Sequence, residues 1–151
     1  MGLTPLIPGQ QEAIEALVAS GRLAPVPVDL ARASAFLQQA EHSLADIDSV
    51  RVAQNIHSLA YDAGHAIGEA LLAAYGYRTT NRVGHHDALV RFLGEVLTDA
   101  PGTKAVKHFE RMRRARNKLQ YEARPPSETD ARAASRTATV LVTSARNLGL
   151  R

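Results

Sequence analysis

The residues best suited to chemistry lie in one strongly basic segment. Between Lys104 and Lys118 the sequence has seven cationic side chains and one anionic side chain, a charge of +6 within 15 residues. The whole chain carries only +3, so the remainder is mildly acidic. A short basic block on an acidic body indicates a local anion site rather than a generally adhesive protein.

Arg116 is out of place within this segment. A helix turns by about 100° per residue, which gives the segment one apolar stripe. The stripe contains Ala105, Phe109, Met112, Leu119 and Ala123. Arg116 falls in the same stripe, where an apolar residue is expected. A guanidinium directed at an apolar seam costs several kcal/mol unless it is paired or opens into a cleft.

Two interpretations of Arg116 follow from this cost. In the first, the guanidinium pairs with a carboxylate of another helix, Asp62 or Glu69, or extends to solvent. In the second, it lines a cleft together with polar neighbours on one flank of the stripe, where planar, permanently charged donors suit a phosphate. Those neighbours are Arg113, Asn117 and Gln120.

The remaining cations of the segment fall on its outer face. They are Lys104, Lys107, Arg111, Arg114 and Lys118. A solvated surface explains them, although contacts to a phosphate backbone would use the same residues.

The segment FERMRRARNKLQYEA (109–123) resembles the signature helix of the HEPN superfamily. In that helix an arginine is followed by a polar residue and, four to six positions later, by a histidine. Arg116 and Asn117 match the first two elements, and Tyr121 lies where the histidine is expected. The preceding AYDAGHAIGEALLAAYGYRT (60–79), the GHH loop and ALVRFL (88–93) are also similar to the family, so the resemblance covers roughly residues 30 to 148.

The resemblance implies an α-helical, usually dimeric domain in which two such arginines face a shared cleft. Many members are metal-independent RNases of toxin–antitoxin, phage-defence or RNA-processing systems, and others are non-catalytic partners of nucleotidyltransferases. We therefore expect an RNA- or nucleotide-phosphate-binding domain, without cofactor or metal, whose partners are RNA, a second copy of the chain, and an antitoxin or nucleotidyltransferase. A non-catalytic helical adaptor is the alternative. The expected catalytic residues are Arg116, Asn117 and Tyr121, and the expected phosphate- or RNA-binding residues are Arg113, Gln120 and Arg114.

The chain departs from the family pattern at the histidine. Tyrosine has an ordinary pKa of about 10 and is a poor proton carrier near pH 7, so cleavage is expected only if another group replaces it. The candidate replacements are His42, His57, His65, His85, His86 and His108. Among them, His85 and His86 begin a helix, and a loop that reached the cleft would bring either one near Arg116.

The elements that position these residues are predicted to be helices. The chain has 26 alanines, and its seven prolines lie outside the long periodic segments. Helices are predicted over 10–19, from Asp29 onward, from about residue 49 to Gly76, from His85 and His86 to a stop at residues 100–102, from Thr103, and from a capping box at Ser127. Residues 23–28 read as an extended connector, and no strand is predicted. The expected architecture is an all-α, up-and-down, HEPN-like bundle of four to five main helices over residues 29–151, preceded by a short helical arm over residues 1–28.

The longest predicted helix has a second feature opposite its apolar stripe. His57, Tyr61, Gly64 and Gly68 share that side, and two glycines four residues apart indicate a close approach of another helix. Packing against the final helix of the same chain and a dimer contact both fit this pattern.

Length and composition exclude several protein classes. A chain of 151 residues fits one domain, and the absence of cysteine excludes disulfide scaffolds and thiolate metal sites. No apolar run reaches the roughly 18 residues needed to cross a bilayer, and the N-terminus lacks a signal-peptide pattern. A soluble, cytoplasmic protein is expected.

Overall fold

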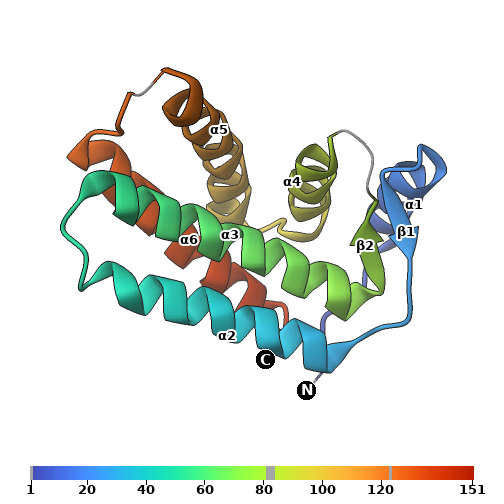
Figure 1. The fold of residues 1–151 in the computed structure, drawn as a ribbon. Coiled ribbons are helices and arrows are strands. Elements are labelled where there is room, and N and C mark those ends of the chain that lie inside the picture. The colour runs from blue at the N-terminus through green and yellow to red at the C-terminus, as the bar shows by residue number, and fades with distance from the viewer. Residues whose placement is uncertain (1, 81–83, 123) are drawn as a thin grey trace.

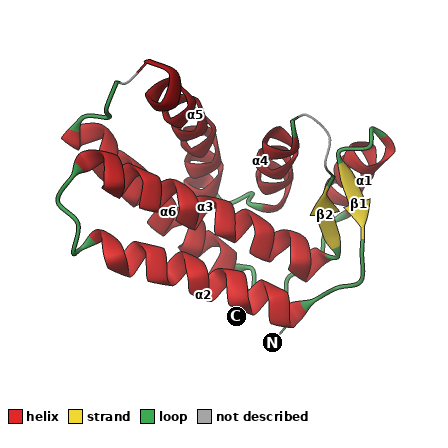
Figure 2. Cartoon of the chain, in the orientation of Figure 1, coloured by secondary structure: helices red, strands yellow, loops and turns green. Residues whose placement is uncertain are grey.

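The computed structural model of the chain describes residues 2–80, 84–122 and 124–151, and only the backbone of residues 85 and 118–122. These ranges contain six helices and two short strands (Figures 1 and 2). The elements are α1 (Pro8–Ala19), β1 (Leu23–Pro25), α2 (Leu30–Ile47), α3 (Ala53–Tyr75), β2 (Tyr77–Thr79), α4 (His85–Val96), α5 (Ala100–Glu122) and α6 (Glu128–Asn147). The prediction of an all-α protein is confirmed.

Helix α3 is the centre of the bundle. It packs against α2 along its length and against α6, while α4 and α5 stand on the remaining side (Figure 1). Alanine-rich faces allow this close approach, and Ala60, Ala63 and Ala70 of α3 are fully buried. The side of α3 that carries His57, Tyr61, Gly64 and Gly68 is buried as well, because side chains of α4, α5 and α6 pack against it.

The two glycines of α3 serve contacts within the chain. A Cβ at Gly64 would lie 2.6 Å from Cε1 of Phe109 in α5 and 3.2 Å from Cδ1 of Leu141 in α6. A Cβ at Gly68 would meet the Leu89 side chain of α4. The close approach predicted from the sequence is therefore intrachain, and it involves α4 and α5 as well as the final helix.

Three of the predicted helix ends are present in the structure. The Asp29 carboxylate accepts a hydrogen bond from the Arg32 amide at 2.9 Å and caps α2. Ser127 and Asp130 form the reciprocal capping box that begins α6. Gly76 ends α3 in the left-handed conformation, with φ of +87°.

Two local predictions are wrong. Residues 100–102 were expected to stop a helix, but they form the first turn of α5, because the Asp99 carboxylate accepts a hydrogen bond from the Gly102 amide at 2.9 Å and Pro101 suits a first turn. Residues 23–25 and 77–79, expected as connector and loop, pair as antiparallel strands. Strand β1 precedes α2 and strand β2 follows α3, and their pairing satisfies backbone N–H and C=O groups of these two connections.

The N-terminal segment packs onto the bundle. Helix α1 contacts α4, and its Ile14 is fully buried in the same apolar core as the residues of α3. The Gln10 side-chain amide donates a hydrogen bond to the carbonyl oxygen of Glu95 at 2.7 Å. Within the described part of the chain, no helix is long and apolar enough to cross a membrane.

Candidate functional site

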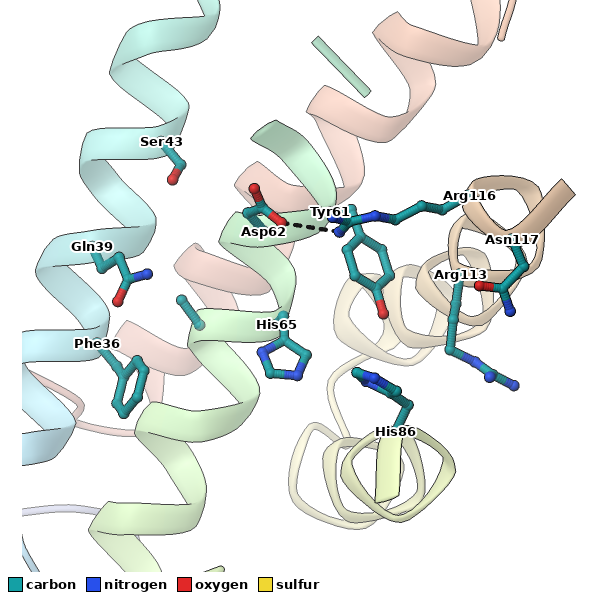
Figure 3. Close-up of a pocket in the computed structure, with 11 residues that line it drawn as sticks. Phe36, Gln39, Ser43, Tyr61, Asp62, His65, His86, Arg113, Arg116 and Asn117 are labelled. Atoms are coloured by element: carbon teal, nitrogen blue, oxygen red, sulfur yellow. Dashed lines mark hydrogen bonds and ion pairs between the residues drawn. The ribbon is translucent and has the colours of Figure 1, made fainter. Parts of the chain in front are cut away.

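A polar cavity of about 470 Å³ lies over α3, between α2 on one side and α4 and α5 on the other (Figure 3). Its aromatic and polar walls come from four helices. The lining residues are Phe36, Gln39 and Ser43 of α2, Tyr61, Asp62, His65 and Ala66 of α3, His86 of α4, and Arg113, Arg116 and Asn117 of α5.

Arg116 lies at the centre of this cavity wall. Its Nη1 donates a hydrogen bond to Oδ1 of Asp62 at 3.0 Å, and its guanidinium carbon lies 4.7 Å from the centre of the Tyr61 ring (Figure 3). The pairing with Asp62 that the first interpretation named is present, and Arg116 also lines a cavity with Arg113 and Asn117, two of the three neighbours that the second interpretation named. The side chains of Arg116 and Asp62 are 36% and 51% exposed. An ion pair this accessible contributes only about 0–1 kcal/mol, so an incoming anion can replace the carboxylate.

The Tyr61 ring, on which the Arg116 guanidinium packs, is itself held by the apolar core. The ring stacks on Phe109 with centroids 5.2 Å apart, and the residue is only 6% exposed. Burial raises the pKa of the Tyr61 hydroxyl above 10, although the nearby Arg116 and Arg113 lower it. The hydroxyl therefore stays protonated at neutral pH and can act as an uncharged donor at the cavity wall.

Arg113 is the second guanidinium of the cavity. It donates a hydrogen bond to Oε1 of Glu110 at 3.0 Å, and this hydrogen bond is the main reason why the pKa of Arg113 is raised. Asn117 lies one turn further along the same face of α5 and presents its amide to the cavity. Arg114, by contrast, does not line the cavity: it is 70% exposed and lies beside Glu110. Three of the six predicted site residues, Arg113, Arg116 and Asn117, are thus brought together.

Two predicted site residues cannot be placed. The backbone of Gln120 and Tyr121 belongs to α5, but their side chains lie outside the described residues, as does the side chain of His85. Their expected roles stay predictions.

Two histidines face the same cavity from different helices. His65 comes from α3 and His86 from the first turn of α4, and their rings meet edge to face with centroids 5.4 Å apart (Figure 3). His65 lies four residues after Tyr61, a spacing that puts both on one face of α3. That spacing was readable from the sequence, but it did not show that this face meets α5. Histidine is the side chain that ordinarily changes charge near neutral pH, so the cavity is lined by two side chains suited to proton transfer.

The two arginines of the cavity are each paired with a carboxylate. Among the lining residues, Arg113 and Arg116 are cationic and Asp62 is the one anion, and Glu110, which does not line the cavity, pairs with Arg113. Protonation of His65 or His86 would make the charge of the cavity more positive. Within the described ranges, no group of three or more His, Asp or Glu side chains is placed to hold a metal ion.

Two other candidate histidines, His57 and His108, lie outside the cavity. His57 is 3% exposed, and burial is the main cause that lowers its pKa below 6.5, with His108 and Arg116 lowering it further and Asp130 opposing them. His108 lies 2.6 Å, Nδ1 to Oγ1, from Thr137 of α6. Neither lines the cavity.

Comparison with known proteins adds no relative, since no family model, curated protein or solved structure matches the chain.

Proposed function

We propose that the cavity binds a phosphodiester of RNA and that its histidines allow metal-independent cleavage of that bond. The observation that carries the proposal is the meeting of Arg113, Arg116 and Asn117 with His65 and His86 around one cavity. The resemblance of residues 109–123 to the HEPN signature helix supports RNA as the polymer and an HEPN-like domain as its setting.

Binding rests on donors that the cavity already holds in place. Guanidinium groups bind phosphate oxygens through paired, charge-assisted hydrogen bonds. Arg116 is oriented by the Tyr61 ring and by Asp62, so little side-chain freedom is lost when a phosphate takes the place of the carboxylate. The amide of Asn117 and the neutral hydroxyl of Tyr61 add uncharged donors.

Cleavage requires a base and an acid beside the bound phosphate. In the proposed step, one imidazole takes the proton of the ribose 2′-hydroxyl, and the 2′-oxygen forms a bond to phosphorus. The bond from phosphorus to the 5′-oxygen breaks, and that oxygen receives a proton from the second, protonated imidazole. The products are a 2′,3′-cyclic phosphate and a 5′-hydroxyl. Arg113 and Arg116 stabilise the charge that accumulates on the non-bridging oxygens.

The test separates binding from cleavage. Binding is measured with a 2′-O-methyl RNA, which lacks the attacking hydroxyl, and cleavage is measured on unmodified RNA in EDTA by gel electrophoresis. We expect Arg116→Gln to weaken binding by about tenfold or more, because a charged hydrogen bond contributes about 1.5–3 kcal/mol, and to abolish cleavage. Arg78→Gln, an exposed arginine of β2, is the charge-matched control. Equal behaviour of wild type and Arg116→Gln in both assays contradicts the proposal and leaves a helical adaptor.

The partners predicted from the resemblance remain part of the proposal. A second copy of the chain would bring a second Arg116 to a shared cleft, and a monomeric mass at micromolar concentration contradicts this dimer. Besides a second copy of the chain, the expected protein partner is an antitoxin or nucleotidyltransferase encoded beside it.

A further inference from the structure

A second groove lies between α5 and α6, on the other side of α5 from the cavity. It has a volume of about 470 Å³, and its walls combine small apolar residues with cations from both helices. The cations are Lys104 and Arg111 of α5 and Arg136 of α6, and His108 and Thr137 lie between them. No acidic side chain lines this groove among the residues that the structure describes.

The three cations of this groove have no carboxylate partner among the described residues, a property that they share with other exposed cations such as Lys107 and Arg78. Lys104, Arg111 and Arg136 form no ion pair with any described residue, whereas Arg113, Arg114, Arg116 and Arg132 all do. Three unneutralised charges from two helices are thus held along one groove. Such an arrangement lowers the energy of an anion placed there.

His108 lies in the groove, among these cations. Burial lowers the pKa of His108 below 6.5, and Arg111 and Arg136 lower it further, against an opposing effect of Asp130. Both guanidinium groups are therefore close enough to the groove to act on a ring within it. The hydrogen-bond contact with Thr137 fixes that ring between α5 and α6.

The outer face of α5 connects the groove to the cavity. At about 100° per residue, Arg113 lies roughly 140° around the helix from His108, so the two sites use different faces of α5. Lys107 and Arg114, both exposed, occupy the outer surface between those faces. Lys104 and Arg116 are separated by about 18 Å along the helix axis at 1.5 Å per residue. A chain of phosphates can follow this surface from one site to the other.

We propose that the groove between α5 and α6 binds backbone phosphates of the same single-stranded RNA whose reacting phosphate occupies the cavity. This inference rests on the proposed function for its choice of polymer. The groove supplies affinity without reading sequence, because its charged donors meet phosphates. Such contacts extend the binding site to several nucleotides and make affinity strongly dependent on salt.

The experiment compares two ligands that differ in length. The probes are a 2′-O-methyl dinucleotide, which fits the cavity alone, and a 2′-O-methyl 12-mer, which can reach the groove. The groove variant is Lys104→Gln/Arg111→Gln/Arg136→Gln. The control variant, Arg51→Gln/Arg78→Gln/Arg151→Gln, removes the same charge from exposed positions away from α5. Thermal unfolding checks that each variant is folded, and Lys104→Arg/Arg111→Lys/Arg136→Lys keeps the groove charge if the glutamine variant does not fold.

We expect the groove variant to bind the 12-mer about tenfold more weakly than the control variant does, with the dinucleotide unaffected. The slope of log K against log salt should fall in magnitude by about 2, since each lost contact to a single strand contributes about 0.7. Equal 12-mer affinity of the groove and control variants overturns the inference. A loss of binding to a poly-glutamate peptide, without a loss for the 12-mer, also overturns it by identifying an acidic protein as the partner.

Failure of the proposed function gives a different pattern. If Arg113→Gln/Arg116→Gln leaves dinucleotide binding unchanged, the cavity is not a phosphate site. The 12-mer affinity of the groove variant still decides whether the groove binds RNA.

Discussion

Arg116 and Asp62, 54 residues apart in the sequence, form a hydrogen-bonded ion pair in the wall of the cavity. If the cavity binds phosphate as proposed, the carboxylate stands where a phosphate oxygen would bind Arg116. Asp62 would then both orient Arg116 and compete with the phosphate. This relationship leads to the first prediction.

Asp62→Asn should strengthen the binding of the 2′-O-methyl RNA. An exposed pair of this kind contributes about 0–1 kcal/mol, so the gain is expected to reach up to about fivefold, with little change in stability. Asp46→Asn, an exposed position on α2, makes the same change of net charge away from the cavity. Affinity that is no higher for Asp62→Asn than for Asp46→Asn would show that Asp62 does not compete with the phosphate.

His86→Gln should abolish cleavage while RNA binding is largely retained. A positioned acid or base typically contributes 10² to 10⁴ in rate, so single-turnover cleavage should fall by about 10² or more. Tyr121→Phe, which removes only the hydroxyl, is expected to have a smaller effect, because the imidazoles of the cavity carry the protons. If Tyr121→Phe loses the activity and His86→Gln keeps it, the tyrosine performs the role assigned here to histidine.

Gly64→Ala should destabilise the protein although alanine is the better helix former. The new Cβ would lie 2.6 Å and 2.8 Å from two ring carbons of Phe109, and overpacking of this kind costs about 1–3 kcal/mol. Gly94→Ala is the matched control, since Gly94 is exposed on α4 and its nearest atom would be 3.9 Å away. That variant should gain up to about 1 kcal/mol. Urea unfolding measures the free energy of unfolding of both variants. Equal changes in this free energy for Gly64→Ala and Gly94→Ala contradict the packing assigned to Gly64.

Stability should decrease as the pH falls below about 6.5. Burial keeps the pKa of His57 lower in the folded protein than in the unfolded chain, so the unfolded chain binds the proton first. The contribution of neutral His57 to the free energy of unfolding is complete above the pKa of the unfolded chain. It is lost as the pH falls toward the lower pKa that His57 has in the folded protein. His57→Gln should make the free energy of unfolding less dependent on pH between 7 and 5. The same dependence in wild type and His57→Gln would exclude His57 as the cause.

The sequence by itself determined the helices and several of their ends, because these depend on residues three or four positions apart. The Asp29 cap, the Ser127–Asp130 box and the glycine at the end of α3 are local hydrogen-bond patterns that a sequence displays directly. The start of α5 was missed because the cap at Asp99 precedes a Pro-Gly pair that resembles a helix stop.

Tertiary structure decided which histidines join the arginines and Asn117 at the site. Periodicity identified Arg116 as misplaced and put Arg113 and Asn117 beside it. The predicted helix start singled out His85 and His86 among the six histidines, but it did not show that either one reaches the cavity. The angles at which α4 and α5 stand on α3 bring His65 and His86 to the cavity, and they leave His57 and His108 elsewhere. In the same way, the packing of α6 against α5 joins Arg136 to Lys104 and Arg111 in one groove. A helical pattern fixes which residues share a face, whereas which faces meet depends on how side chains such as Phe109 and Leu89 fit against Gly64 and Gly68.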